Sequence, residues 1–298
     1  MLVLSVGLIG SGTMGAAMAS RLLDRDFQVT VWNRSGVPPE LVERGARVAE
    51  GPHGVFADGL AVSMLAHDAA LEQVFGEELL PALPEGSVHI SMATIDPLTA
   101  ESMAALHERH GVGFVAAPVL GRSPLAAAGQ LTVLCSGEAA ALERAQPVFD
   151  ALGKRTWRFG ETAEEVGNSL RVKVATNYLI IHALEAMGES IAVLEQSGID
   201  TSRFVEVLGD SLFPGVVYAT YGAMIAEERY LPPGFTATLG LKDLNLALAA
   251  AERAGLTLPT GGVLTEVFEQ AIAAGLGESD WSAIAQVTRA SLDNGVQS

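Results

Sequence analysis

The chain has 298 residues, of which 49% are hydrophobic and 18% charged, as in a folded globular protein rather than a disordered one. This length suffices for two domains, each with a core of its own. The formal net charge of −17 argues against nucleic acid and anionic membranes as partners, because an acidic surface repels phosphate groups. The single cysteine, Cys135, excludes an intrachain disulfide.

The first residues, 1–6, form an apolar run that leads directly into a glycine turn and lacks the basic leader of a signal peptide. We therefore interpret this run as the start of a buried strand. No uninterrupted apolar stretch reaches the roughly 20 residues of a membrane-spanning helix. Together these observations predict a cytoplasmic protein.

The N-terminal half alternates short apolar runs with segments of helical periodicity. This alternation predicts an α/β fold with a doubly wound, parallel sheet covered by helices on both faces. Cys135 falls in the last expected strand, where a thiol usually behaves as a small buried hydrophobe. The expected strands are residues 4–9, 28–32, 60–65, 88–91, 114–116 and 131–135, and expected helices include 14–23, 97–110 and 138–152.

The pattern changes near Phe159, and from Glu164 onward nearly every segment has helical periodicity. We place the domain boundary at about residue 162, with an α/β domain over 1–162 and an all-α domain over 163–298. Residues 164–195 contain no proline and predict one long helix that joins the two domains. The later helix breaks are expected at Gly198, Pro214, residues 232–234 and Gly255.

A glycine-rich turn follows the first strand and opens the first helix. It contains the G-x-G-x-x-G pattern as Gly10, Gly12 and Gly15. The first glycine permits a tight turn, the second lets the backbone approach a pyrophosphate, and the third lets helix and strand pack closely. The helix N-terminus then offers free N–H groups to an anion, so strand, turn and helix together favour a dinucleotide site over an ordinary turn. The residues beside these glycines that we assign to the same site are Ser11, Thr13 and Met14.

The end of the second expected strand predicts which dinucleotide is bound. An NAD site usually has an acidic residue there, which binds the ribose 2′-hydroxyl. This chain has Asn33, Arg34 and Ser35 instead. The planar guanidinium of Arg34 suits a 2′-phosphate and Ser35 adds a hydroxyl, so we predict NADP(H) as the cofactor. The alternative is a solvated surface arginine.

Two polar residues of the expected long helix, Lys173 and Asn177, lie four positions apart and therefore share a face. Their immediate neighbours are mostly apolar, which suggests a polar pair that faces a cleft. His182 lies about half a revolution from Lys173 and cannot join the pair. Spacing alone does not distinguish Lys173 from a snorkelling surface lysine, and the same holds for Lys242.

Four blocks of sequence resemble the β-hydroxyacid dehydrogenase family, which includes 3-hydroxyisobutyrate dehydrogenases and glyoxylate/succinic semialdehyde reductases. The resemblance implies an N-terminal Rossmann domain and an all-α C-terminal domain, as in 6-phosphogluconate dehydrogenase. It also implies a homodimer or higher homo-oligomer, because helical domains of this kind interlock. The blocks are residues 7–15 with 18–19, 91–97, 117–122 with 129–131, and 167–177, reinforced by 234–235 and 242–243.

The resemblance further implies roles for individual residues. Lys173 would give a proton to the carbonyl oxygen during reduction and accept it in reverse, and Asn177 would orient the substrate or the lysine. Burial and nearby cations would favour the neutral lysine and ease proton exchange near neutral pH. The residues that would line the nicotinamide pocket are Met64, Leu65 and Thr94. Those that would close the site from the C-terminal domain are Phe235 and Lys242.

The third block departs from the family pattern. It usually reads Pro-Val-Ser-Gly-Gly or Pro-Val-Ser-Gly-Ser, and its small residues bind a substrate carboxylate, whereas here Leu120 and Arg122 flank Gly121. A smaller departure is Ala93, where the family often has serine. We therefore predict NADP-dependent interconversion of a small 3-hydroxy acid or alcohol with its aldehyde or keto form, at an altered substrate site. The residues assigned to substrate binding are Leu120, Gly121, Arg122 and Lys242.

Two other functions stay open at this point. Imine reductases share this architecture and cofactor but usually have Asp, Tyr or another residue in place of Lys173, so Lys173 disfavours this alternative while the altered substrate loop supports it. A non-catalytic NADPH-binding module is disfavoured by the joint presence of Lys173, Asn177 and Lys242. No metal ligands are assigned, and the sequence names neither the substrate nor the physiological direction.

Overall fold

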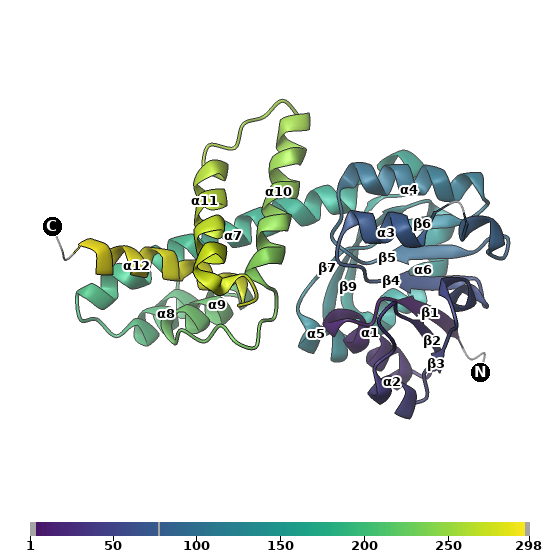
Figure 1. Ribbon diagram of the computed structural model, residues 1–298, viewed down its shortest axis with the longest axis horizontal. Helices are drawn as coiled ribbons and strands as arrows, with labels where there is room; N and C mark the ends of the chain where they lie inside the picture. Colours follow the sequence, from purple (N-terminus) through teal and green to yellow (C-terminus); the bar gives the residue numbers. More distant parts are fainter. Residues whose placement is uncertain (1–3, 77, 296–298) are drawn as a thin grey trace. The chain divides into compact units, whose positions relative to one another are not determined.

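The computed structural model describes residues 4–76 and 78–295, with side chains described as far as Ala290. The chain divides into two compact units, Met1–Lys173 and Val174–Ser298 (Figure 1). The division falls within helix α7 (Asn168–Gln196), which begins shortly after the boundary expected from the sequence. Each unit has a hydrophobic core of its own.

A mixed β-sheet forms the centre of the first unit. Its strands are β1 (Ser5–Ile9), β2 (Gln28–Trp32), β3 (Arg47–Val48), β4 (Leu60–Ser63), β5 (Val88–Ser91), β6 (Gly113–Ala116), β7 (Val119–Leu120), β8 (Leu131–Gly137) and β9 (Gly153–Gly160). They lie in the order β3-β2-β1-β4-β5-β6-β8-β7, and β9 pairs with β8. The pairs from β3 to β6 are parallel, as the sequence predicted. Part of the predicted first strand, residues 1–3, lies outside the described residues.

The strand order reverses beside β1, because the chain proceeds from β1 to β2 and β3 on one side and then places β4 on the other. In doubly wound sheets, ligands bind in the crevice at the carboxyl ends of the strands at such a reversal. Gly10 and Met64 directly follow β1 and β4 and so lie at this edge. The backbone N–H of Gly10 donates to Trp32 O (3.0 Å) and that of Met64 to Ile9 O (2.9 Å), which fixes the ends of the three strands together.

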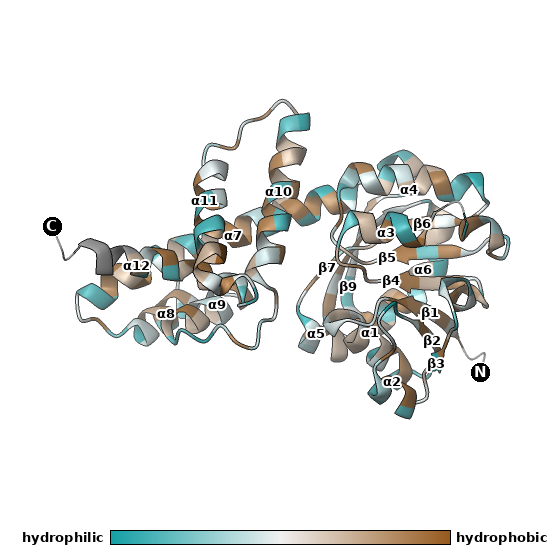
Figure 2. Ribbon diagram, viewed as in Figure 1, coloured by the Kyte–Doolittle hydropathy of each residue, from teal (hydrophilic) through white to brown (hydrophobic). Residues whose placement is uncertain are grey.

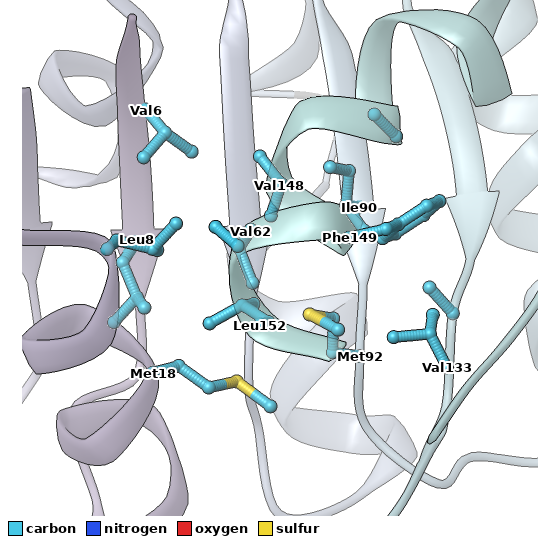
Figure 3. Close-up of a cluster of buried hydrophobic side chains, with 14 of the residues drawn as sticks. Val6, Leu8, Met18, Val62, Ile90, Met92, Val133, Val148, Phe149 and Leu152 are labelled. Atoms are coloured by element: carbon cyan, nitrogen blue, oxygen red, sulfur yellow. The ribbon is translucent and has the colours of Figure 1, made fainter. Parts of the chain in front are cut away.

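Helices cover both faces of this sheet, and Figure 2 shows that its strands are mostly hydrophobic. Val62 and Ile90 point to one face, where they join a cluster with Met18 of α1 and Phe149 of α6 (Figure 3). Ala61 points to the other face and joins the cluster built with α3 and α4. Strands buried on both faces have continuous apolar runs, which is why the sequence pattern located them. The helices are α1 (Thr13–Asp24), α2 (Pro39–Glu43), α3 (Asp68–Val74), α4 (Pro97–Arg109), α5 (Ser123–Ala127) and α6 (Ala139–Leu152).

One end of the sheet is antiparallel, which the sequence pattern did not predict. β8 runs antiparallel to both β6 and β7. Only residues 121–130, with the short helix α5, separate β7 from β8, and a parallel connection needs a crossover of about a dozen residues or more. The two-residue strands β3 and β7 carry no periodicity, and β9 is rich in charged residues, so none of the three has the apolar alternation of a predicted strand.

The second unit is all-α, as predicted. Its core includes Leu184 and Met187 of α7 together with Phe268 and Trp281. The predicted long helix corresponds to α7 but begins at Asn168, because residues 163–165 form a separate 3-10 turn. In the described chain, no helix is both long enough and apolar enough to span a membrane. The remaining helices, with all predicted breaks lying between them, are α8 (Thr201–Asp210), α9 (Val216–Ala226), α10 (Ala237–Arg253), α11 (Gly261–Ala271) and α12 (Ala285–Gly295).

Two buried histidines lie in the core between the sheet and helices α3 and α4. His89 Nε2 is 2.7 Å from Ser63 Oγ, and His89 Nδ1 is 2.9 Å from His107 Nε2. His107 Nδ1 lies 2.7 Å from Met103 O, and the His89 ring stacks on Phe75 at 3.7 Å. Burial lowers the pKa of His89 well below its ordinary value and that of His107 to about 4.

We expect the free energy of unfolding to fall as the pH is lowered from about 6.5 to about 4. Between these values the unfolded chain binds protons on the two histidines and the folded chain does not. Their contribution is therefore complete above the unfolded pKa and declines as the pH falls towards the folded pKa. For His107 alone the loss is on the order of 3 kcal/mol. Urea unfolding at several pH values, with His107→Leu as the comparison, measures it, and equal pH dependence in both proteins would contradict the assignment.

Candidate functional site

A pocket of about 1000 Å³ opens at the reversal of strand order in the first unit. One wall follows the end of β2, and another is formed by the start of α3 and the residues before it. The site residues predicted from the sequence that line it are Gly10, Gly12, Asn33, Arg34, Ser35, Met64 and Leu65. The lining residues that the sequence did not suggest include Pro52, His53, His67, Ala70 and Gln73.

The glycine turn has the geometry that a pyrophosphate site needs. Gly10 has a φ of +92°, a left-handed conformation that disfavours other residues. A Cβ on Gly15 would lie 1.9 Å from Gly10 O, whereas a Cβ on Gly12 would meet nothing within 4 Å. Gly12 is the N-cap of α1 and has no side chain to occupy the first N–H groups, which are left for a ligand. Ser11 Oγ, buried in this turn, has no hydrogen-bond partner among the described residues, as expected of a group awaiting a ligand.

The end of β2 is fastened to the glycine turn through Asn33. Its Oδ1 accepts a hydrogen bond from Ser11 N (3.3 Å), and its Nδ2 donates to Ser35 Oγ (2.9 Å) and Gly36 O (2.8 Å). Arg34 and Ser35 are exposed at the pocket wall. Asn33 therefore holds the Ser35 side chain and fixes the turn that also carries Arg34, the other residue that the sequence assigned to a 2′-phosphate.

Thr94, predicted to lie beside the nicotinamide, is half-buried in the loop after β5 and does not line the pocket at the end of β2. The N–H of Asp96 in the same loop donates to Asp68 Oδ1 (2.8 Å), and Asp96 Oδ1 accepts from Leu98 N, so the loop is held against α3 and caps α4. Ser11, Thr13 and Met14 lie on the glycine turn and the first turn of α1 but outside the lining of this pocket.

A second group of predicted residues meets in the helical unit. Asn177 Nδ2 donates to Asp243 Oδ2 (2.5 Å), and Lys242 Nζ lies 3.0 Å from Asp243 Oδ1. Asn177 and Asp243 are both buried. Because this amide donates through Nδ2, its Oδ1 is presented as an acceptor. Lys173, half-buried, precedes Asn177 by four residues on the continuous helix α7 and so shares its face.

Asp243 is the residue of this group that the sequence reasoning did not assign. A buried carboxylate that holds both an amide and an ammonium fixes the orientation of each. Its position directly after Lys242 was the available signal, but spacing along α10 alone did not show which residue of α7 it meets. Phe235, also predicted for the site, packs edge-on against Trp281 at 5.0 Å within the helical unit.

The predicted substrate loop turns sharply between β7 and α5. Gly121 has a φ of +134°, and a Cβ there would lie 2.8 Å from a methyl group of Leu131, so this position requires glycine. Leu120 ends β7 and is paired with Thr132. Arg122 is half-buried and occupies the N-cap position of α5, but its side chain makes no capping hydrogen bond. Helix capping therefore does not explain why an arginine stands at this position.

Cys135 and His182 make contacts that indicate a structural role. Cys135 is fully buried in β8, as predicted, and burial raises the pKa of its thiol to about 11, which disfavours the reactive thiolate. His182 Nε2 contacts Thr260 Oγ1 at 2.7 Å and its Nδ1 contacts Tyr178 O at 2.8 Å. The side chain of His182 is thus held on a different face of α7 from Lys173.

The strand order, the pocket and the glycine turn of the first unit are those of a dinucleotide-binding Rossmann domain, which here precedes an all-α unit. Residues 5–162 match the family model described as the NAD binding domain of 6-phosphogluconate dehydrogenase. Residues 167–288 match the model for the NAD-binding domain of NADP-dependent 3-hydroxyisobutyrate dehydrogenase. The chain belongs to the β-hydroxyacid dehydrogenase family, whose members are NAD(P)-dependent dehydrogenases and reductases. The predictions of family and fold class are confirmed.

Individual relatives match over nearly their whole length. The chain is 38% identical to the uncharacterised oxidoreductase YfjR of Bacillus subtilis (strain 168), with 94% of this chain and 98% of the relative covered. It is 33% identical to glyoxylate/succinic semialdehyde reductase 1 of Arabidopsis thaliana, with 97% and 100% covered. The crystal structure of 3-hydroxyisobutyrate dehydrogenase from Salmonella typhimurium is similar with a TM-score of 0.84 at 25% identity, covering 95% of this chain and 99% of that one.

Proposed function

We propose that this protein is an NADP(H)-dependent reductase of small aldehydes or keto acids, which also oxidises the corresponding 3-hydroxy acid or alcohol. The observation that carries this proposal is the shared face of Lys173 and Asn177 on α7, with Asn177 fixed by the buried Asp243. A proton-transferring amine beside an oriented amide is the arrangement that carbonyl reduction needs. The name of the Arabidopsis relative, a glyoxylate/succinic semialdehyde reductase, supports the same substrate class.

The residues present fit a bound dinucleotide. The turn from Gly10 to Met14 would hold its pyrophosphate, Arg34 and Ser35 its 2′-phosphate, and Met64, Leu65, Thr94 and Phe235 would surround its nicotinamide portion. The buried, unpartnered hydroxyl of Ser11 supports this assignment. When bound, the dinucleotide supplies or takes up the hydride. We propose 1–162 as the domain that binds it and 163–298 as the domain for substrate and assembly.

The side chains then divide the remaining work. Lys173 gives a proton through Nζ to the carbonyl oxygen in reduction and removes it from the hydroxyl in oxidation. Asn177 orients the lysine or the substrate through Oδ1, because its Nδ2 is engaged by Asp243. Lys242, held by Asp243, adds positive charge for an anionic substrate. Leu120 and Gly121 shape the substrate loop beside Arg122.

A turnover screen tests the proposal. NADPH oxidation is followed with short semialdehydes, 2-keto acids and cyclic imines as substrates. Turnover of semialdehydes or keto acids supports the proposal. Turnover of cyclic imines alone would replace it with imine reduction, and NADPH binding without turnover of any class would leave a non-catalytic binding module.

Arg122 gives a prediction about the substrate. We propose that its guanidinium binds the anionic end of the substrate through two charge-assisted hydrogen bonds, in place of the family serine at Leu120. Arg122→Ala should then lower kcat/KM for anionic substrates by about one to two decades, mainly through KM, and leave neutral aldehydes nearly unaffected. Equal losses on both substrate classes would show a structural arginine. If the wild type itself prefers neutral carbonyls, the substrate carries no carboxylate.

We also propose that the protein forms a homodimer or a larger homo-oligomer. The helical unit leaves large apolar side chains exposed, among them Leu179 (70% exposed) and Val193 (66%) of α7 and Val216 (68%) of α9. Exposed apolar groups that gather on one part of a molecule usually mark interfaces. Light scattering at micromolar concentration should therefore give at least a dimer, and a monomer there would contradict this.

A further inference from the structure

We propose that the buried hydrogen-bonded chain Ser63–His89–His107 is a positioning device for the dinucleotide pocket, and that the Ser63 hydroxyl sets the affinity for the cofactor through it. The inference rests on the proposed function, because the pocket at the end of β4 is taken as the cofactor site. None of these side chains lines the pocket, so they act on it through the elements that carry them.

The chain of hydrogen bonds has a single direction. Met103 O can only accept, so His107 Nδ1 carries a proton and donates to it. The neutral ring then accepts at Nε2, and His89 Nδ1 donates to it. His89 accepts in turn at Nε2, from the hydroxyl of Ser63. Every polar atom of the two imidazoles is thereby satisfied, and one tautomer of each ring fits.

Packing alone does not account for two histidines at this place. Both are fully buried, and their rings lie among aromatic side chains, with Phe75 stacked on His89 and Phe114 edge-on to His107 at 5.0 Å. Apolar residues could fill this space without the desolvation cost of the ring nitrogens. A fully satisfied polar network instead selects one arrangement of the elements that contribute to it.

The three side chains lie on β4, β5 and α4, which adjoin the pocket or the loop of Thr94. Ser63 is the last residue of β4, and the next residue, Met64, lines the pocket. A Cβ on Gly10 would lie 2.4 Å from Met64 O, so the backbone at Met64 closely adjoins the glycine turn. His89 lies in β5, which leads into the loop of Thr94, and His107 lies in α4, which begins where that loop ends. These hydrogen bonds thus link the end of β4, where the pocket wall begins, to β5 before the loop and to the last turn of α4 after it.

The register of the strands explains how Ser63 and His89 meet. Ala61 of β4 is paired with His89 of β5, so Ser63, two residues further along the same face, is the diagonal neighbour of His89. The N–H of Met92 donates to Ser63 O (2.9 Å), so the same serine also fixes the start of the loop through its backbone. A small change in the position of Ser63 would therefore move both the pocket wall and the loop.

The test compares NADPH dissociation constants, by fluorescence titration, with thermal stability for matched buried serines. Ser63→Ala should raise the dissociation constant about threefold to tenfold, corresponding to one lost hydrogen bond. Ser136→Ala is the control, because the Ser136 hydroxyl is equally buried and donates to Val166 O (2.7 Å) in the same unit but away from the pocket. It should lower the melting temperature and leave the dissociation constant unchanged.

Ser63→Thr retains the hydroxyl and should bind NADPH with the affinity of the wild type. His89→Phe keeps an aromatic ring stacked on Phe75 but removes the ring nitrogens, so it should weaken NADPH binding as Ser63→Ala does. If Ser63→Ala lowers the melting temperature but binds NADPH like the wild type, the hydrogen bonds of Ser63, His89 and His107 have only a structural role and the proposal is overturned. Ser63→Thr binding as weakly as Ser63→Ala also overturns it. A wild type that binds no dinucleotide would instead refute the proposed function itself, which separates the two failures.

Discussion

Replacing Lys173 by alanine should lower kcat on the best carbonyl substrate by about 10²–10⁴-fold, the range that a positioned general acid contributes. The reason lies in the face of α7 that Lys173 shares with Asn177, whose amide is held by the buried Asp243. In the proposed mechanism, removal of the amine leaves the carbonyl oxygen without its proton donor, while the glycine turn and Arg34 stay in place. NADPH binding should therefore change little. Steady-state kinetics together with a fluorescence titration measure the two effects separately.

Two further variants make this result specific. Lys173→Arg keeps the positive charge but cannot release a proton readily, so it should be nearly as slow as the alanine variant. Lys154→Ala removes an exposed lysine from β9, outside the lining of the cofactor pocket, and should have the kcat of the wild type. Near-normal turnover by Lys173→Ala would remove this residue from the mechanism, and loss of activity in all three variants would indicate damage to the fold.

Much of the sheet could be predicted because its strands are buried on both faces. Val62 and Ile90 face one helical layer and Ala61 the other, so β4 and β5 have continuous apolar runs in the sequence. The glycine turn was predictable for a different reason, since two of its glycines are required by the local backbone geometry. Gly10 adopts a positive φ, and there is no room for a Cβ on Gly15. Both requirements can be inferred from the spacing of the glycines in the sequence.

The parts that escaped prediction depend on contacts between segments distant in sequence. His67 lies on the wall of the pocket, but its ring binds Ala70 N at the start of α3 and has no pattern that marks it as a pocket residue. Asp243 meets Asn177 across 66 positions of the chain. The polar chain in the core is a similar case, because nothing in the spacing of Ser63 and His89 indicates that they are diagonal neighbours. Pairing of this kind is decided by the register of strands and helices, which single-segment periodicity does not contain.

We propose that cofactor preference depends on the end of β2, and Arg34→Asp should therefore reverse it. The wild type should have the higher kcat/KM with NADPH than with NADH, because Arg34 and Ser35 at the pocket wall offer a guanidinium and a hydroxyl to the 2′-phosphate. In the variant, the carboxylate repels that phosphate and can accept hydrogen bonds from the ribose hydroxyls of NADH, as the acidic residue of NAD sites does. Loss of hydrogen bonds to a charged group already costs about 1.5–3 kcal/mol, so kcat/KM with NADPH should fall by about 10²-fold or more.

The comparison with NADH separates this effect from general damage, because the NADH reaction does not involve a 2′-phosphate and should be retained or improved in Arg34→Asp. Arg25→Asp provides the matched charge reversal, since Arg25 is exposed at the end of α1 and does not line the pocket. That variant carries the same change in net charge and should keep the wild-type preference, which excludes a long-range effect of added negative charge on a protein that already has a net charge of −17.

A wild type that uses NADH with the higher kcat/KM would refute the NADP(H) assignment outright. Equal losses with both dinucleotides in Arg34→Asp would show that Arg34 supports the end of β2 rather than reading the phosphate, and the hydrogen bonds of Asn33 to Ser35 and Gly36 would then be the next ones to remove.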